Sequence, residues 1–154
     1  MPTTDSYLFF KALHVIGTVL LVGNVTVTGF WAAYMFRFRR RNVAFRPIAR
    51  AILWTDLVFT LGGATLLSVT GVLMARQAHL PILGTPWIRH APIALSVSGL
   101  LWLTILLPDQ LRMERSDPNN DRLIRGLFVR WSVVGWIAAA LLYYGVWVMV
   151  TRTG

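Results

Sequence analysis

The sequence contains no cysteine, and this absence excludes several kinds of site. Without a thiol in its 154 residues, the chain cannot form disulfide bonds, zinc ribbons or iron–sulfur clusters, nor use thiol catalysis. Lysine is almost absent as well, because Lys11 is the only one beside 14 arginines. There is no Gly-rich phosphate loop, no nucleophile elbow and no span with paired carboxylates, so the motifs assign no reaction.

Charged residues are scarce, and hydrophobic residues are correspondingly abundant. Charged side chains make up 14% of the chain and hydrophobic ones 56%, whereas a soluble domain has about 25% and about 45–50%. A soluble chain of this length could not bury so much apolar surface. The composition therefore indicates a protein whose solvent is the lipid bilayer.

Four apolar segments are long enough to cross a bilayer as helices, which needs about 20 residues, range about 17–25. They span residues 12–34, 51–75, 91–107 and 131–150. The connections are too short for a second domain. We therefore predict an all-α, four-transmembrane-helix bundle that forms a single integral membrane domain over residues 1–154.

The arginines are distributed unequally between the two sides of such a bundle. Eleven lie in the first and third connections, at positions 37, 39, 40, 41, 46, 50, 112, 115, 122, 125 and 130, against four basic residues on the other side. The positive-inside rule then places both termini outside and the arginine-rich connections inside. We expect the net charge of +9 to interact with the anionic membrane surface and not with nucleic acid.

The third connection, residues 108–130, mixes acidic and basic side chains. We expect Pro108 to end the third span, and the charged residues that follow it, Asp109 and Glu114 among them, to form a solvated hairpin of ion pairs. Trp131 lies at the start of the fourth span, where aromatic side chains are typical of the membrane interface.

Asp56 is an ionisable residue inside a predicted span, which is costly in lipid and therefore a functional hypothesis by default. At 1.5 Å per residue, Asp56 lies at the depth of Thr28, with Asn24 about one turn away. Thr60 follows Asp56 on the same helix face. The sequence predicts a polar knot of these four residues, which either joins the helices or handles protons or a ligand.

His14 lies near the outer end of the first span. A neutral imidazole there could bind haem iron, copper or zinc, or hydrogen bond to a neighbouring helix. His79, His90 and Met74 fall on the same side of the membrane. These side chains would suit copper, or His14 and His90 could hold a haem between the first and third helices.

Several motifs resemble an uncharacterised bacterial family of predicted integral membrane proteins, catalogued as a domain of unknown function. They are the runs Phe10–Gly17, Thr55–Thr60, Gly84–Trp87 and Ser98–Leu103. The resemblance extends over nearly the whole chain and keeps the order of the motifs. It implies a membrane protein and no particular activity.

The run Lys11–His14 is also distantly similar to HemJ-type protoporphyrinogen oxidases and to CopD-like copper-resistance membrane proteins. In the HemJ-type family a histidine at this place is linked to haem binding, and His14 would inherit that role. That family also uses a lysine on its third helix, and this chain has none there. The departure argues against protoporphyrinogen oxidation, while haem binding could persist.

The leading hypothesis is therefore a bacterial inner-membrane protein that binds haem b and is redox-linked through His14, with His90 as a second candidate ligand. The alternatives are copper handling by His14, His79, His90 and Met74, and a cofactor-free structural or accessory subunit. In each case we expect a homo-oligomer or a larger membrane complex.

Overall fold

The computed structural model describes residues 4–38, 45–117 and 120–153, and every regular element within them is a helix. The elements are α1 (Thr4–Arg37), α2 (Phe45–Thr55), η1 (Asp56–Leu61), α3 (Gly62–Gln77), α4 (Pro86–Leu101), η2 (Trp102–Leu106), α5 (Leu107–Arg115) and α6 (Asp121–Thr151). The elements η1 and η2 are π-helical. Each continues without a break into the α-helices beside it, so the described residues form four long rods.

These four rods confirm the predicted all-α fold. In the described part of the chain, four helices are long and apolar enough to cross a membrane: Asp5–Arg37, Arg50–Gln77, Pro86–Arg115 and Asp121–Thr151. At 1.5 Å per residue, rods of this length reach about 42–50 Å. That exceeds a hydrocarbon core of about 30 Å, so their ends extend beyond it.

The predicted end of the third span at Leu107 is wrong. The helix passes through Pro108 and continues to Arg115. Proline normally breaks a helix because it lacks an N–H and clashes with the carbonyl four residues earlier. Here the carbonyl four residues before Pro108 belongs to Thr104, which lies in the π-helical η2 (Trp102–Leu106), where the turn is wider than in an α-helix. Since α6 begins at Asp121, the predicted hairpin is mostly helix.

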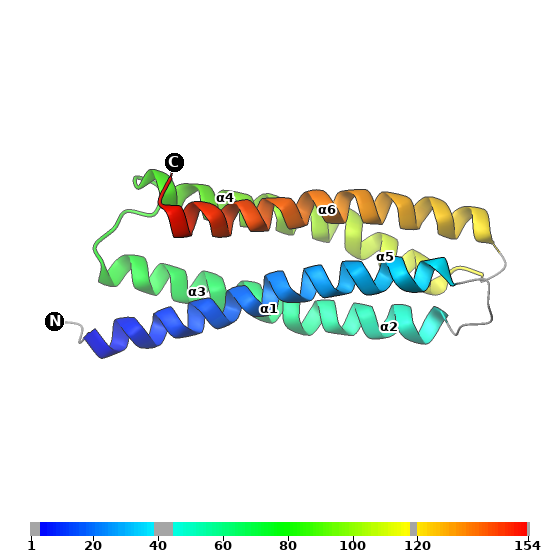
Figure 1. Cartoon of the computed structure of the whole chain (residues 1–154), viewed down its shortest axis with the longest axis horizontal. Coiled ribbons are helices and arrows are strands. Elements are labelled where there is room, and N and C mark those ends of the chain that lie inside the picture. Colours follow the sequence, from blue (N-terminus) through cyan, green and yellow to red (C-terminus); the bar gives the residue numbers. More distant parts are fainter. Residues whose placement is uncertain (1–3, 39–44, 118–119, 154) are drawn as a thin grey trace.

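The helices run alternately up and down, and both chain ends lie at one end of the bundle (Figure 1). We call this the terminal end. The other is the arginine end, because it holds Arg37, Arg50, Arg112, Arg115, Arg122 and Arg125. Residues 39–44, with three of the predicted anchoring arginines, lie outside the described residues. That the arginine end faces the cytoplasm stays a prediction.

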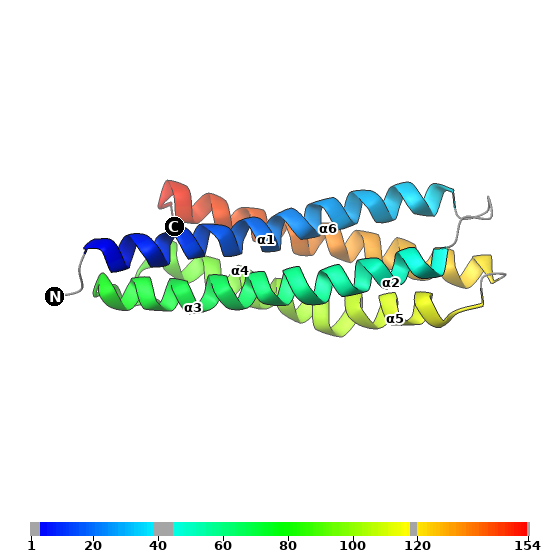
Figure 2. The same cartoon turned by 90° about the horizontal axis from the view of Figure 1, so that it is seen from below.

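The helices associate mainly as two antiparallel pairs, α1 with α3 and α4 with α6, while α2 meets α5 at the arginine end (Figures 1 and 2). The Ser98 hydroxyl on α4 donates to the Ala138 carbonyl on α6 at 3.1 Å. The rings of Phe36 on α1 and Phe128 on α6 stack at 3.8 Å. The first contact lies within the α4–α6 pair, and the second joins the two pairs into one bundle.

Two glycines let α1 and α3 approach backbone to backbone. A Cβ atom on Gly63 would lie 2.8 Å from the Leu21 nitrogen, and one on Gly17 would lie 2.8 Å from the Leu67 nitrogen. No side chain fits in such a space, so the two helices are closely packed here. Small residues commonly permit this approach between membrane helices.

We predict that Gly63→Ala destabilises the protein, whereas the neighbouring Gly62→Ala does not. The added methyl group at 63 collides with α1 backbone, and such overpacking typically costs about 1–3 kcal/mol. A Cβ on Gly62 meets nothing within 4 Å, and alanine there favours the helix by up to about 1 kcal/mol. Thermal unfolding in detergent measures both variants. Equal unfolding temperatures would contradict the close crossing.

Candidate functional site

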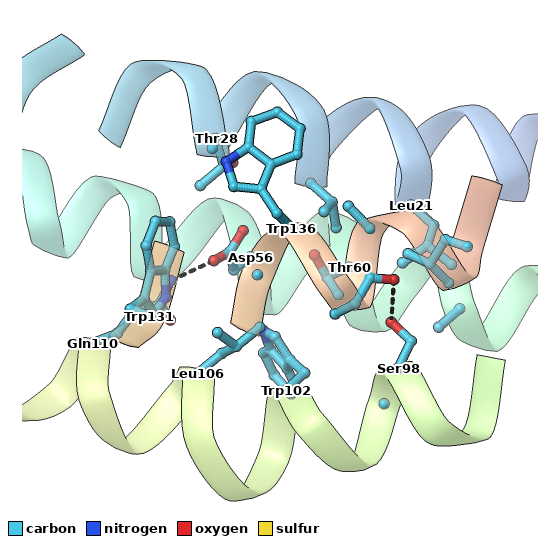
Figure 3. A pocket seen from close by; sticks show the side chains of 18 of the residues that line it. Leu21, Thr28, Asp56, Thr60, Ser98, Trp102, Leu106, Gln110, Trp131 and Trp136 are labelled. Atoms are coloured by element: carbon cyan, nitrogen blue, oxygen red, sulfur yellow. Dashed lines mark hydrogen bonds between the residues drawn. The ribbon is translucent and has the colours of Figure 1, made fainter. Parts of the chain in front are cut away.

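A cavity of about 240 Å³ lies inside the bundle, between all four rods (Figure 3). Its lining is predominantly apolar. The polar side chains that line it come from every rod: Thr28, Asp56, Thr60, Ser98, Trp102, Gln110, Trp131, Ser132 and Trp136. A largely apolar cavity with a few convergent polar groups is the usual form of a small-molecule site. This cavity is therefore the candidate site.

The carboxyl group of Asp56 is the most polar feature of the cavity, and its residue is only 5% exposed. One oxygen, Oδ1, accepts a hydrogen bond from Asn24 Nδ2 on α1 at 2.8 Å. The other, Oδ2, accepts from Gln110 Nε2 on α5 at 2.6 Å. Asp56 therefore joins three rods through one side chain.

The predicted polar knot is present as a set of hydrogen bonds. Asn24 Nδ2 also donates to the Thr60 hydroxyl at 3.2 Å. The Thr28 hydroxyl donates to Asn24 Oδ1 at 3.4 Å. The structure thus brings together all four residues that the depth argument grouped, and adds Gln110 to them. Whether they only join helices or also hold a ligand is a separate question.

Three buried polar atoms around the cavity have no hydrogen-bond partner among the described residues. They are the indole Nε1 atoms of Trp102 and Trp131 and the Oε1 atom of Gln110. Each of these residues is more than nine-tenths buried and lines the cavity. A buried unpaired donor or acceptor costs roughly 1–3 kcal/mol. Residues that line the cavity therefore carry two donors and one acceptor that a ligand could pair.

Both π-helical segments border this cavity. Asp56 begins η1 and Trp102 begins η2, and both residues line the cavity. A π-helical turn contains an extra residue, which changes the direction in which the side chains after it point. Such segments are rare and occur frequently at functional sites. Here one π-helical segment carries the Asp56 carboxyl group, and the other carries the Trp102 indole.

His14 lies between α1 and α3 in the terminal half of the bundle and does not line the cavity. Its Nδ1 is 2.9 Å from the Leu67 carbonyl oxygen and 3.2 Å from the Thr70 hydroxyl. A carbonyl can only accept, so Nδ1 donates to it, and in the neutral ring Nε2 is then the unprotonated nitrogen. Gly71 leaves room for the ring, because a Cβ there would lie 3.0 Å from His14 Cε1. Its predicted bond to a neighbouring helix is therefore present.

The other predicted ligands lie in different surroundings. His90 Nδ1 is 3.0 Å from the Tyr144 hydroxyl on α6. His79 is exposed after α3, with a left-handed φ of 53°, a backbone conformation in which histidine is enriched. Met74 lies on α3. Within residues 4–38, 45–117 and 120–153, no three His, Cys, Asp or Glu side chains are grouped to hold a metal ion.

The expectation that Asp109 is solvated is wrong. Asp109 is fully buried, and both its oxygens accept hydrogen bonds from the Arg130 guanidinium on α6. The mixed charges of this region pair because the helix continues through Pro108 and lies against α6. Glu114 likewise pairs with Arg50 on α2, at 3.1 Å. Acidic side chains here join helices and do not form a solvated loop.

Sequence reasoning also missed Gln110, Trp102 and Trp131 as site residues. Gln110 lay within the predicted hairpin, and Trp131 was assigned to the aromatic belt, although it is buried in the core with Trp102. A helical projection continued through Pro108 would have aligned Gln110 with Trp102 and Leu106. No sequence signal identifies the π-helical turns that set this alignment.

Together, the rods and their predominantly apolar surfaces define a four-helix integral membrane protein. A family model described as "Predicted integral membrane protein (DUF2269)" matches residues 8–153, and the chain belongs to this family. This confirms the resemblance to an uncharacterised membrane family. No curated protein and no solved structure gives a significant match. The likeness to HemJ-type and CopD-like proteins stays a prediction.

We predict that Asp56→Ala destabilises the protein by about 1–3 kcal/mol, because it leaves the buried Gln110 amide without its acceptor and the half-buried Asn24 amide with only the Thr60 hydroxyl. Thr104→Ala is the control, since the Thr104 hydroxyl is exposed and bonds only the Leu100 carbonyl of its own rod. Thermal unfolding in detergent compares the two variants. An Asp56→Ala protein as stable as the control would show that these bonds contribute nothing.

Proposed function

We propose that this protein binds a small lipid-soluble molecule carrying at least one polar group in the cavity around Asp56. The observation that carries the proposal is the set of unpaired polar atoms on Trp102, Trp131 and Gln110 in a mainly apolar cavity. An apolar lining favours a lipid-soluble body, and the unpaired atoms favour a polar group on it.

The size of the cavity suits one substituted ring. A cavity of about 150 Å³ lined by apolar side chains accepts benzene, and this one measures about 240 Å³. Drug-sized ligands occupy about 300–1,000 Å³. The site therefore takes a single-ring compound or a head group of that size.

Thymol, an apolar ring with one hydroxyl group, is a suitable probe. We expect it to bind saturably to the protein in nanodiscs, measured by isothermal titration calorimetry. Gly99→Leu should abolish this binding, because Gly99 lines the cavity and a Cβ there meets nothing within 4 Å. The new side chain then fills the space without displacing backbone.

Gly62→Leu is the matched control, because its Cβ position is equally open but lies outside the cavity lining. It should bind thymol as the unchanged protein does. Identical titrations of all three proteins would mean that thymol only partitions into the lipid. That result would overturn the proposed function.

His14 supports a second candidate, haem b binding. The Leu67 carbonyl orients the ring and leaves Nε2 unprotonated, the state in which histidine binds iron. His90 is hydrogen bonded to Tyr144 on the other helix pair. This proposal therefore takes His14 as the principal ligand. Bound haem would supply one-electron chemistry.

We predict that protein expressed with ample haem shows a Soret band that shifts on reduction with dithionite. His14→Ala should lose the band, whereas His79→Ala should keep it, because His79 is exposed in the turn after α3. A featureless spectrum of the unchanged protein, or an intact band in His14→Ala, would exclude His14 as the haem ligand. Copper handling and a cofactor-free accessory role would then be the remaining predictions.

A further inference from the structure

We propose that the ligand of the cavity is a quinone head group, bound as the quinone or as its quinol. This inference rests on the proposed function, since it names the chemical class that the same cavity takes. It follows from where the cavity opens, which hydrogen-bonding atoms are unpaired around it, and what its walls are made of.

We infer that the cavity is reached from lipid between α1 and α6. These helices contact each other at two places, where the Thr26 and Tyr143 hydroxyls are 2.7 Å apart and where Phe36 stacks on Phe128. Between these contacts the lining residues of α1 are small (Thr28, Gly29 and Ala33), and α6 contributes the small residues Ser132, Gly135, Ala138 and Ala139 beside the larger Trp131, Trp136 and Leu142.

Trp136 is 61% exposed and extends from α6 toward α1 (Figure 3). Gly29 and Ala33 on α1 also line the cavity, and a Cβ on Gly29 would meet nothing within 4 Å. A ring could therefore enter sideways from the membrane while an attached hydrocarbon tail stays in lipid. Membrane quinones consist of such a ring and tail.

The unpaired atoms match the two oxidation states of this ring. A quinone has two carbonyl oxygens, which only accept, and the cavity offers two unpaired donors, Trp102 Nε1 and Trp131 Nε1. A quinol has two hydroxyls, which also donate, and Gln110 Oε1 is an unpaired acceptor beside the Asp56 carboxyl group. A ligand with one hydroxyl leaves an indole unpaired, and an anion would be repelled by an ionised Asp56.

The walls of the cavity also favour a flat ring. Trp102, Trp131 and Trp136 all line it, and indoles pack well against planar π systems in offset or edge-to-face arrangements. The volume of about 240 Å³ accommodates one substituted ring and not a long chain. The ring would thus lie in the cavity and the tail in the bilayer.

Duroquinone and durene test the chemical class, because they share the tetramethyl ring and differ only in the two carbonyl oxygens. We expect calorimetric titration of the protein in nanodiscs to show duroquinone binding at least about tenfold more tightly than durene or thymol. One hydrogen bond in a buried site is worth up to about 1.5 kcal/mol, and 1.4 kcal/mol is about tenfold in affinity.

Trp102→Phe and Trp131→Phe should each weaken duroquinone binding by about three- to tenfold, because they remove one indole donor. They should leave durene binding nearly unchanged. Trp54→Phe is the control, since Trp54 is exposed and does not line the cavity. Its titrations should match those of the unchanged protein.

The outcomes separate this inference from the proposed function. If thymol or durene binds as tightly as duroquinone and Gly99→Leu abolishes that binding, the cavity is a ligand site but not a quinone site. If no probe binds in a manner that depends on Gly99, the proposed function fails as well. Duroquinone binding that survives both tryptophan substitutions overturns the assigned hydrogen bonds and with them the quinone inference.

Discussion

The buried carboxyl group of Asp56 is the constraint on which the arrangement of the bundle depends. A carboxyl group inside a membrane protein must find its hydrogen-bond partners within the protein, because lipid offers none. Asp56 finds them on two other rods, in Asn24 on α1 and Gln110 on α5. Satisfying one side chain thus sets the relative position of three of the four helices. The cavity lies beside this group.

Two kinds of contact hold the remainder of the bundle around that site. Gly17 and Gly63 let α1 and α3 meet backbone to backbone, which closes the space between His14 and the Asp56 group. At the arginine end, Asp109 is buried against Arg130, and removal of one member of such a buried pair is usually costly. The cavity lies between the close packing on one side and the paired charges on the other.

The functional proposals follow from polar atoms that the fold leaves unsatisfied. Native proteins pair nearly all their buried polar groups, and the exceptions call for an explanation. Here three exceptions, on Trp102, Trp131 and Gln110, surround one cavity, and both π-helical segments border it. His14 differs in that its Nδ1 is already paired with backbone, so only its Nε2 is available to a cofactor.

The sequence by itself determined the membrane environment, the four helices, and the grouping of Asn24, Thr28, Asp56 and Thr60, because these follow from hydropathy and from the fixed rise of a helix. Only the tertiary structure decided the roles of Gln110, Trp102, Trp131 and Asp109. Their positions depend on a helix that continues through Pro108, which local rules treat as a helix end. That continuation is accompanied by the π-helical turn of η2, whose i→i+5 bonding has no signature in hydrophobic periodicity. The sequence therefore indicated the polar residues of α1 and η1, and only the contacts between helices showed that Gln110, Trp102 and Trp131 belong to the same site.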